Sequence, residues 1–274
     1  MKKKNQLLIY CFTFCLLSNC SSNDDSPTIP TGQTKQYNLT NTELSDLTGQ
    51  VNFIENTNGS TTISVILNNT VKGINNVVRL RRNTANIGGG IFLNLNNING
   101  DNGTSITTVS KLTDGTKITY DQFADLNGYF AIEGTGDSEG VLYAFTDLGP
   151  NEFTGKKITY DLFSPNGDIN GLAQFEERKK GSAALMVGLF DLGAEDELLC
   201  SLHIIQENTS EEIIHILSPI RSRLKGFGFT ELSDINGQSL NYEDILKLDA
   251  FINVKTSNDN LISEGGVGIN IDYN

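Results

Sequence analysis

The chain has no tryptophan and only two histidines among its 274 residues. Sugar-binding modules commonly stack pyranose rings on tryptophan, so its absence disfavours that class. His203 and His215 are too few to build a metal site from converging imidazoles. A lone histidine on a strand is more often structural than catalytic, and the chain has no G-x-S-x-G nucleophile elbow. We therefore predict no catalytic residue, no metal site and no cofactor.

Long apolar runs are also scarce, and the run near the start spans about eleven residues, from Leu7 to Leu17. A permanent membrane helix needs about 20 residues. A lysine-rich start before this run is typical of a secretory signal, predicted here as residues 1–19. The signal ends at Leu17-Ser18-Asn19-Cys20, which is similar to a lipobox, although Asn19 replaces the usual Gly or Ala. We predict that Cys20 is lipidated; the alternative is an ordinary signal peptide with an incidental cysteine.

Cysteine is rare, with four residues in the whole chain. Cys11 and Cys15 leave with the signal, and Cys20 takes the lipid. Cys200 alone remains, so the mature chain forms no internal disulfide. His203 lies three residues from Cys200, and strand alternation would place the two on opposite faces. A buried structural thiol is therefore the expected role of Cys200.

Residues 20–36 are polar, contain Pro27 and Pro30, and are predicted to be a lipidated flexible tether. Acidic residues at Asp24 and Asp25 resemble the export tag that sends some lipoproteins to the outer face of the outer membrane. The expected location is therefore the outer membrane, facing the cell surface. Attachment facing the periplasm is the alternative.

Positive charge is in short supply, because the formal net charge is −13. Removing the three lysines at positions 2–4 with the signal makes it −16. Such a protein repels nucleic acid and anionic headgroups. We therefore expect contact with the membrane only through the lipid anchor, and a protein or surface polymer as the partner.

The rest of the chain repeats itself. An offset of 122 residues aligns Ile118–Ile132 with Leu240–Val254, and it pairs Gly49, Phe53 and Val65 with Gly171, Phe175 and Val187. We predict two domains, residues 37–150 and the more divergent residues 157–274. Short apolar strands such as Ile63–Leu67 and recurrent Asn-Gly and Asp-Gly turns indicate a mainly β fold. One short helix per copy is expected, with a capping box at Thr119–Gln122 and a weaker one at Asn241–Asp244.

Several motifs in order resemble the CHRD domain, named from chordin and common in bacterial secreted proteins. In the first copy they are Gly88-Gly89-Gly90-Ile91, Asn99-Gly100-Asp101-Asn102-Gly103, Asp114-Gly115-Thr116-Lys117-Ile118-Thr119-Tyr120, Asn127-Gly128-Tyr129 and Thr146-Asp147-Leu148-Gly149. The second copy keeps Gln174-Phe175-Glu176-Glu177-Arg178, Asn241-Tyr242-Glu243 and Phe251-Ile252-Asn253-Val254. The resemblance implies two tandem immunoglobulin-like antiparallel β-sandwich domains of unsettled molecular function.

The chain departs from that family at its histidines. Relatives carry a strand of the form H-P-A-H-I-H and a further histidine after the Y-I-N-V strand. Here the alternating positions hold Arg79 and Arg81 in the first copy, and Ser201 and His203 in the second. The later histidine position holds Glu133 in the first copy. If the histidines bind metal in relatives, this chain has lost the site.

Arg79 and Arg81 alternate onto one strand face, and Glu133 is expected on the neighbouring strand. We predict Arg79, Arg81 and Glu133 as a partner-binding surface. Mutual pairing of the opposite charges is the alternative. Acidic glycine-rich loops, such as Gly136–Glu139 and Asn166–Asp168, favour plain turns over calcium sites.

Together these features favour a non-enzymatic cell-envelope lipoprotein that acts as a surface binding or structural module. The alternative is a metal-dependent redox or hydrolytic enzyme on a β-sandwich, since a fold permits either. Bound copper, zinc or iron would distinguish the two.

Overall fold

The computed structural model describes residues 28–42, 44–190, 197–205, 212–221 and 226–270. The predicted signal, Cys20 and the first part of the tether lie outside the described residues. Of the described residues, 59% lie in strands and 7% in helices, so the prediction of a mainly β chain is confirmed. In this described part, no helix combines the length and hydropathy needed to cross a membrane.

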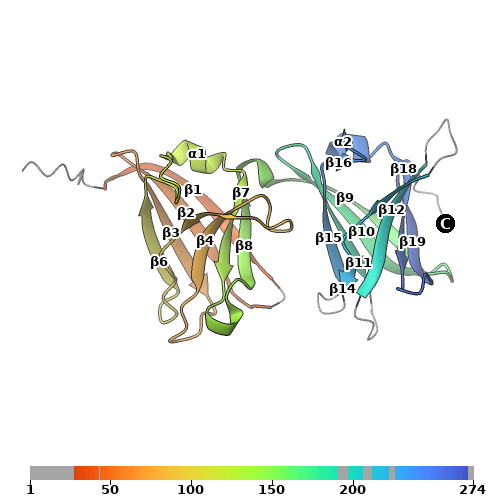
Figure 1. Cartoon of the computed structure of the whole chain (residues 1–274), viewed down its shortest axis with the longest axis horizontal. Helices are drawn as coiled ribbons and strands as arrows, with labels where there is room; N and C mark the ends of the chain where they lie inside the picture. Colours follow the sequence, from red (N-terminus) through yellow and green to blue (C-terminus); the bar gives the residue numbers. More distant parts are fainter. Residues whose placement is uncertain (1–27, 43, 191–196, 206–211, 222–225, 271–274) are drawn as a thin grey trace, which may run out of the picture.

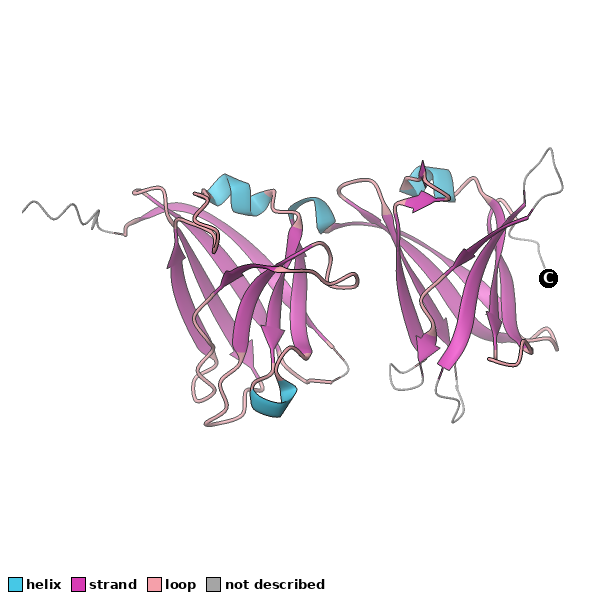
Figure 2. Ribbon diagram, in the orientation of Figure 1, coloured by secondary structure: helices cyan, strands magenta, loops and turns pink. Residues whose placement is uncertain are grey.

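The N-terminal unit, Pro30–Leu148, is a single curled sheet that forms a half-barrel (Figures 1 and 2). In the described residues its strand order is β5-β4-β7-β8-β1-β2-β3-β6. The elements are β1 (Pro30–Asn41), β2 (Thr48–Asn56), β3 (Thr61–Asn68), β4 (Val77–Arg82), β5 (Ile91–Asn94), β6 (Thr104–Val109), α1 (Tyr120–Ala124), β7 (Gly128–Glu133), η1 (Gly136–Ser138) and β8 (Leu142–Leu148).

The C-terminal unit, Phe153–Gly268, follows the short helix η2 (Gly149–Asn151) and closes into a barrel. Its described strand order is β13-β12-β14-β15-β11-β10-β9-β19-β18, with β12 also paired to β18 as β4 is to β7, and β14 closes the ring by bridging β12 and β15. The elements are β9 (Phe153–Phe163), β10 (Ile169–Arg178), β11 (Ala183–Leu189), β12 (Glu197–Ile205), β13 (Glu212–Ile216), β14 (Ile220–Arg221), β15 (Phe227–Leu232), β16 (Asp234–Ile235), β17 (Gln238–Ser239), α2 (Tyr242–Ile245), β18 (Asp249–Lys255) and β19 (Leu261–Gly268).

The two units share one topology and one register. Gly49 pairs with Leu67 across β2 and β3, and Gly171 pairs with Leu189 across β10 and β11. The offset of 122 residues that relates the two sequences therefore also relates the strand pairings. A side chain at Gly49 or Gly171 would strike the carbonyl of the facing strand, so glycine is required at this position in both units.

Each unit encloses its own apolar core. Phe53 packs edge-on against Tyr37, with ring centroids 5.7 Å apart, and it meets Phe123 and Phe130 from the other side of the curled sheet. The C-terminal core has the same edge-on pair, Tyr160 against Phe175, at 5.9 Å. Strand alternation produces this packing, as in β3, where alternate residues from Thr61 to Leu67 face inward.

Both predicted capping boxes are present. Thr119 accepts a hydrogen bond from the Gln122 amide while the Gln122 side chain accepts from the Thr119 amide. Asn241 and Asp244 exchange the same pair of bonds at the start of α2. A cap of this kind contributes about 0.5–2 kcal/mol, which helps a helix of one turn to form.

Two strands begin earlier than the predicted boundaries. β1 starts at Pro30, within the segment 20–36 predicted as a tether, and β9 starts at Phe153, ahead of residue 157. Most of these residues are polar and exposed, and Phe153 is an exposed aromatic, yet they pair with β2 and β10 because ladder hydrogen bonds need only backbone groups. The expectation of immunoglobulin-like sandwiches is not confirmed, since each unit is one continuous curled sheet.

Candidate functional site

The structure brings Arg79, Arg81 and Glu133 together on the outer face of β4 and β7. The Arg79 Nη1 and Arg81 Nε groups each donate to one carboxylate oxygen of Glu133. Glu133 is buried, with 1% of its surface exposed, and this hydrogen bond raises the pKa of Arg81. The arrangement is the mutual pairing that the sequence left as the alternative to partner binding.

Both arginines make further hydrogen bonds. Arg79 donates to Asn94 at 3.2 Å and to Glu139 at 3.4 Å, and Arg81 donates to the Gly89 carbonyl at 3.1 Å. Two guanidinium groups therefore meet two carboxylates, and this cluster carries no net charge. It offers little to an incoming anion.

The equivalent face of the C-terminal unit has different chemistry. Ser201 and His203 occupy the positions of Arg79 and Arg81 in the strand pairing, and their side chains lie 2.8 Å apart. The His203 ring stacks on Phe251 at 4.8 Å. Cys200 is buried, as predicted for a structural thiol, and burial raises its pKa to about 12, so it is not a thiolate at neutral pH.

A second polar cluster, absent from the sequence predictions, joins the two units. Arg178, at the end of β10, is completely buried. Its Nε and Nη2 groups donate to both carboxylate oxygens of Glu231 on β15, and its Nη1 group donates to Asp147 of β8 at 2.9 Å. The guanidinium also lies 4.2 Å from the ring centre of Phe153. We call Arg178, Glu231 and Asp147 the clamp.

Asp147 is the contribution of the N-terminal unit to the clamp. Burial raises its pKa, although Arg178 and the Ala85 amide both act to lower it. One of its oxygens accepts from Arg178 and the other from the Ala85 amide at 2.9 Å, so both oxygens are occupied. Asn86, the residue after Ala85, donates a side-chain hydrogen bond to Glu231 of the C-terminal unit at 3.2 Å.

The connecting segment is fixed from both sides. Asn151 is buried and donates to the Asn83 and Gly128 carbonyls of the N-terminal unit. The amides of Lys179 and Lys180, in the C-terminal unit, donate to the carbonyls of Glu152 and Pro150. The connecting segment, which we call the junction, is therefore held by hydrogen bonds to backbone groups of both units.

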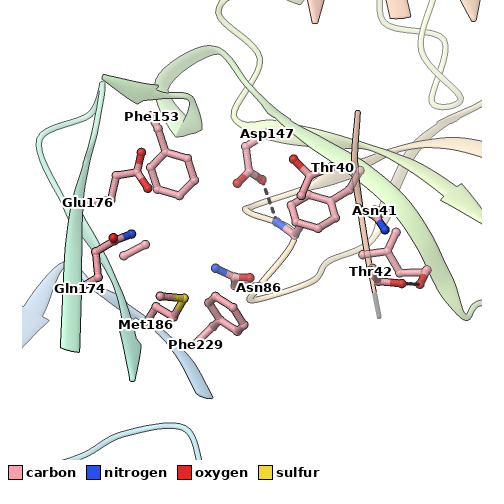
Figure 3. A pocket seen from close by; sticks show the side chains of 14 residues that line it. Thr40, Asn41, Thr42, Asn86, Asp147, Phe153, Gln174, Glu176, Met186 and Phe229 are labelled. Carbon is pink, nitrogen blue, oxygen red and sulfur yellow. Dashed lines mark hydrogen bonds between the residues drawn. The ribbon is translucent and has the colours of Figure 1, made fainter. Parts of the chain in front are cut away.

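Beside the clamp lies a pocket of about 450 Å³, bounded by both units (Figure 3). It is within the size range of small-molecule sites. Its lining combines three phenylalanines and a methionine with amides, hydroxyls and two carboxylates. The N-terminal unit contributes Thr40, Asn41, Thr42, Ala85, Asn86, Leu142, Phe145 and Asp147, and the C-terminal unit contributes Phe153, Gln174, Glu176, Ala184, Met186 and Phe229.

The strand register explains the C-terminal wall of this pocket. Gln174, Met186 and Phe229 are paired in one row across β10, β11 and β15. Ala184 lies in the next row and is small, which leaves space above the sheet. The rows face outward from the barrel and toward the N-terminal unit, so only docking of the two units turns this face into a pocket.

The sequence contains one feature of the clamp, a difference between the two copies at the position of Arg178. The offset of 122 residues pairs Arg178 with Asn56, so one copy places a large cation where the other has a small amide. An arginine at the end of an outward strand face usually indicates a solvated site. Its partners, Asp147 and Glu231, are far away in sequence, and no local pattern connects them.

The other predicted loops form turns. Asp101 accepts from the Gly73 amide at 2.9 Å, and Asn99 accepts from the Asp101 amide at 2.8 Å. Asn236 and Gly237 both have positive φ and form the two-residue hairpin between β16 and β17. In the part of the chain that the structure describes, no three His, Cys, Asp or Glu side chains gather as metal ligands would.

Comparison with known proteins found no matching family model, no similar curated protein and no similar solved structure.

Proposed function

We propose that this chain is a non-enzymatic cell-envelope lipoprotein whose two units form one binding module, with the pocket at the junction as the binding site. The observation that supports it most is the clamp. A buried arginine with three hydrogen-bonded partners fixes the two faces that bound the pocket. A preorganised cavity binds at a lower entropic cost than one assembled on contact.

The pocket is favoured over Arg79 and Arg81 as the binding site. Those two guanidiniums are occupied by Glu133, whereas the pocket presents exposed aromatic rings such as Phe229. Arg79, Arg81 and Glu133 remain a candidate contact surface for a protein or surface polymer partner. They would act there through Glu139 and Asn94 at the rim.

The test is native mass spectrometry of the protein purified from its own cell envelopes. We expect a bound small molecule that is released on denaturation. Met186→Trp should fill the pocket and lose this molecule, while its circular dichroism stays that of a β protein. Equal occupancy in the two proteins, or an empty wild type, would contradict the assignment of the pocket.

The proposed location, the outer membrane with the protein facing the cell surface, is based on Cys20 and the acidic residues that follow it. Cys20→Ala should prevent lipidation and release the protein from the outer membrane. Protease added to intact cells should digest the wild type. Full protection of the wild type while the outer membrane is intact would instead indicate attachment facing the periplasm.

The two units are proposed to be degenerate tandem CHRD-like domains. Their common strand order and register support a duplication, and in the N-terminal unit Phe53 of β2 contacts Phe130 of β7 across the interior of the curled sheet. We propose that they are strongly curled versions of that family's immunoglobulin-like fold. Elemental analysis tests the enzymatic alternative, which requires stoichiometric copper, zinc or iron.

A further inference from the structure

The ionisable side chains that line the junction pocket are both acidic. Its described lining contains no lysine, arginine or histidine, and its two ionisable residues are Asp147 and Glu176. The one nearby guanidinium, that of Arg178, is completely buried and bonded to Glu231 and Asp147. A ligand that carries a carboxylate or phosphate would therefore meet two carboxylates and no cationic side chain in the described pocket lining.

The two carboxylates differ in what they can still bind. Each oxygen of Asp147 already accepts a hydrogen bond, one from Arg178 and one from the Ala85 amide, and its charge is paired with Arg178. Glu176 is half-buried on β10, and within the described residues it has neither an ion pair nor a side-chain hydrogen bond. Its cross-strand neighbour Lys157 makes no ion pair with it either. Glu176 is thus the carboxylate that can receive a cation from the pocket.

The remaining walls suit an apolar body. Figure 3 shows Glu176 beside Phe153, with Met186 and Phe229 below, across the cavity from Thr40. Phenyl faces and thioethers attract both hydrocarbon and organic cations. Phe153 already interacts with a cation in this protein, the Arg178 guanidinium at 4.2 Å.

We propose that the junction pocket binds a small amphiphilic organic cation, an alkyl- or arylalkylammonium. Its ammonium group lies at Glu176, and its apolar body lies against Phe229 and Met186. This inference rests on the proposed function and adds the ligand class. The strongly negative net charge assists it, because it raises the local concentration of cations around the protein.

The test uses three probes of matched shape and different charge: phenylbutylammonium, phenylbutanol and phenylbutyrate. Isothermal titration of the purified protein should show saturable binding of the ammonium, about tenfold tighter than the alcohol and tighter still than the carboxylate. Glu176→Gln should reduce the affinity for the ammonium to that for the alcohol. Phe229→Ala should weaken the binding of phenylbutanol as well as that of phenylbutylammonium.

Glu177→Gln is the matched control. Glu177 is the next residue along β10, pairs with Lys156 at 3.5 Å and does not line the pocket. Its removal should leave the affinity for all three probes unchanged. The same preference after Glu176→Gln, or phenylbutyrate bound as tightly as phenylbutylammonium, would overturn the ligand class.

The outcomes separate this inference from the proposed function. Equal binding of all three probes, lost in Met186→Trp, would overturn the cation preference and leave the pocket as the binding site. Absence of binding by every probe would overturn the cation preference too. If protein from native envelopes then also carries no ligand, the proposed function fails with it.

Discussion

Arg178 is the residue on which the relation between the two units depends. Replacing it with Met removes the charge that neutralises Asp147 and Glu231, both of which are buried. Loss of one partner of a buried ion pair costs about 3–5 kcal/mol, because the other charges remain without compensation. We expect Arg178→Met to lower the free energy of unfolding by about this amount in chemical denaturation, or to separate the units and enlarge the particle in small-angle scattering.

The control for Arg178 is another arginine with the same type of partner. Arg221 pairs with Glu197 at 3.2 Å, and the two side chains are 35% and 49% exposed, in contrast to the buried clamp. Arg221→Met should change the free energy of unfolding by only about 0–1 kcal/mol. If the two variants unfold alike and keep the same dimensions, Arg178 does not hold the units together.

A related prediction concerns how much the ion pairs of Arg79 and Arg81 with Glu133 contribute to stability. From the sequence alone this pairing would be an exposed one worth about 0–1 kcal/mol. Because Glu133 is buried, changing both arginines to Ser leaves its carboxylate without a counter-charge and should cost several kcal/mol, on the order of 3–5. Adding Glu133→Gln should restore much of the loss in thermal unfolding. A double arginine variant of wild-type stability that fails to capture its partner would instead support the binding surface.

The sequence predicts this cluster better than it predicts the clamp, for a physical reason. Arg79 and Arg81 alternate within one strand, and the resemblance to the CHRD domain places Glu133 on the strand where relatives keep their later histidine. The clamp joins β8, β10 and β15 across two units. Docking of two outer sheet faces leaves no periodic signal, so neither the pocket nor its lining could be inferred.

At the scale of elements, the junction after η2 carries a pH-dependent contact. Burial acts to raise the pKa of Glu152, but the hydrogen bonds and charges of Lys35 and Lys179 outweigh it and lower that pKa below its ordinary value of 4.5. A lowered pKa in the folded state contributes stability above pH 4.5, and this contribution is lost as the pH falls further. Unfolding measured across this range should show the acid loss, and Glu152→Gln should reduce it. If the variant loses as much stability at acid pH as the wild type does, Glu152 does not have this role.

Elements of regular pattern were the easiest to predict. The strand around Ile63–Leu67 and the two capped helices follow from alternation and from local hydrogen bonds. The start of β1 and of β9 did not follow, because their exposed residues show no apolar periodicity and are ordered by pairing with a neighbouring strand. Closure of the second sheet depends on β14, a strand of two residues that bridges β12 and β15 and carries no periodic signal.

At the scale of the whole molecule, each unit has its own core, so the folding of the N-terminal unit can be tested without the C-terminal unit. A chain that ends at Gly155 keeps β1–β8 and η2 but loses Arg178. We expect it to fold and to unfold cooperatively, with lower stability than the intact protein because Asp147 and Asn151 lose partners. Near-ultraviolet circular dichroism and denaturant titration would measure this. A truncated chain that is soluble only when the C-terminal unit is supplied would mean that the two share one folding unit.

The clamp is a contact between two different faces of related units. The face of the C-terminal unit that carries the arginine meets the β8 face of the N-terminal unit. Strand pairing identifies the counterparts of each clamp residue in the other copy: Arg178 with Asn56, Glu231 with Thr108, and Asp147 with Gly266.

Head-to-tail contacts between like units can repeat without closing, and they then produce open filaments. Here each copy retains only one half of the contact. The outer face of the first copy has an amide and a hydroxyl where the arginine and glutamate would be needed, and the last copy has a glycine where the aspartate would be needed. A third unit, whether from the same chain or from a neighbouring molecule, would find no charge to pair with at either end. The protein should therefore not polymerise through the faces that hold its two units together, even at high concentration.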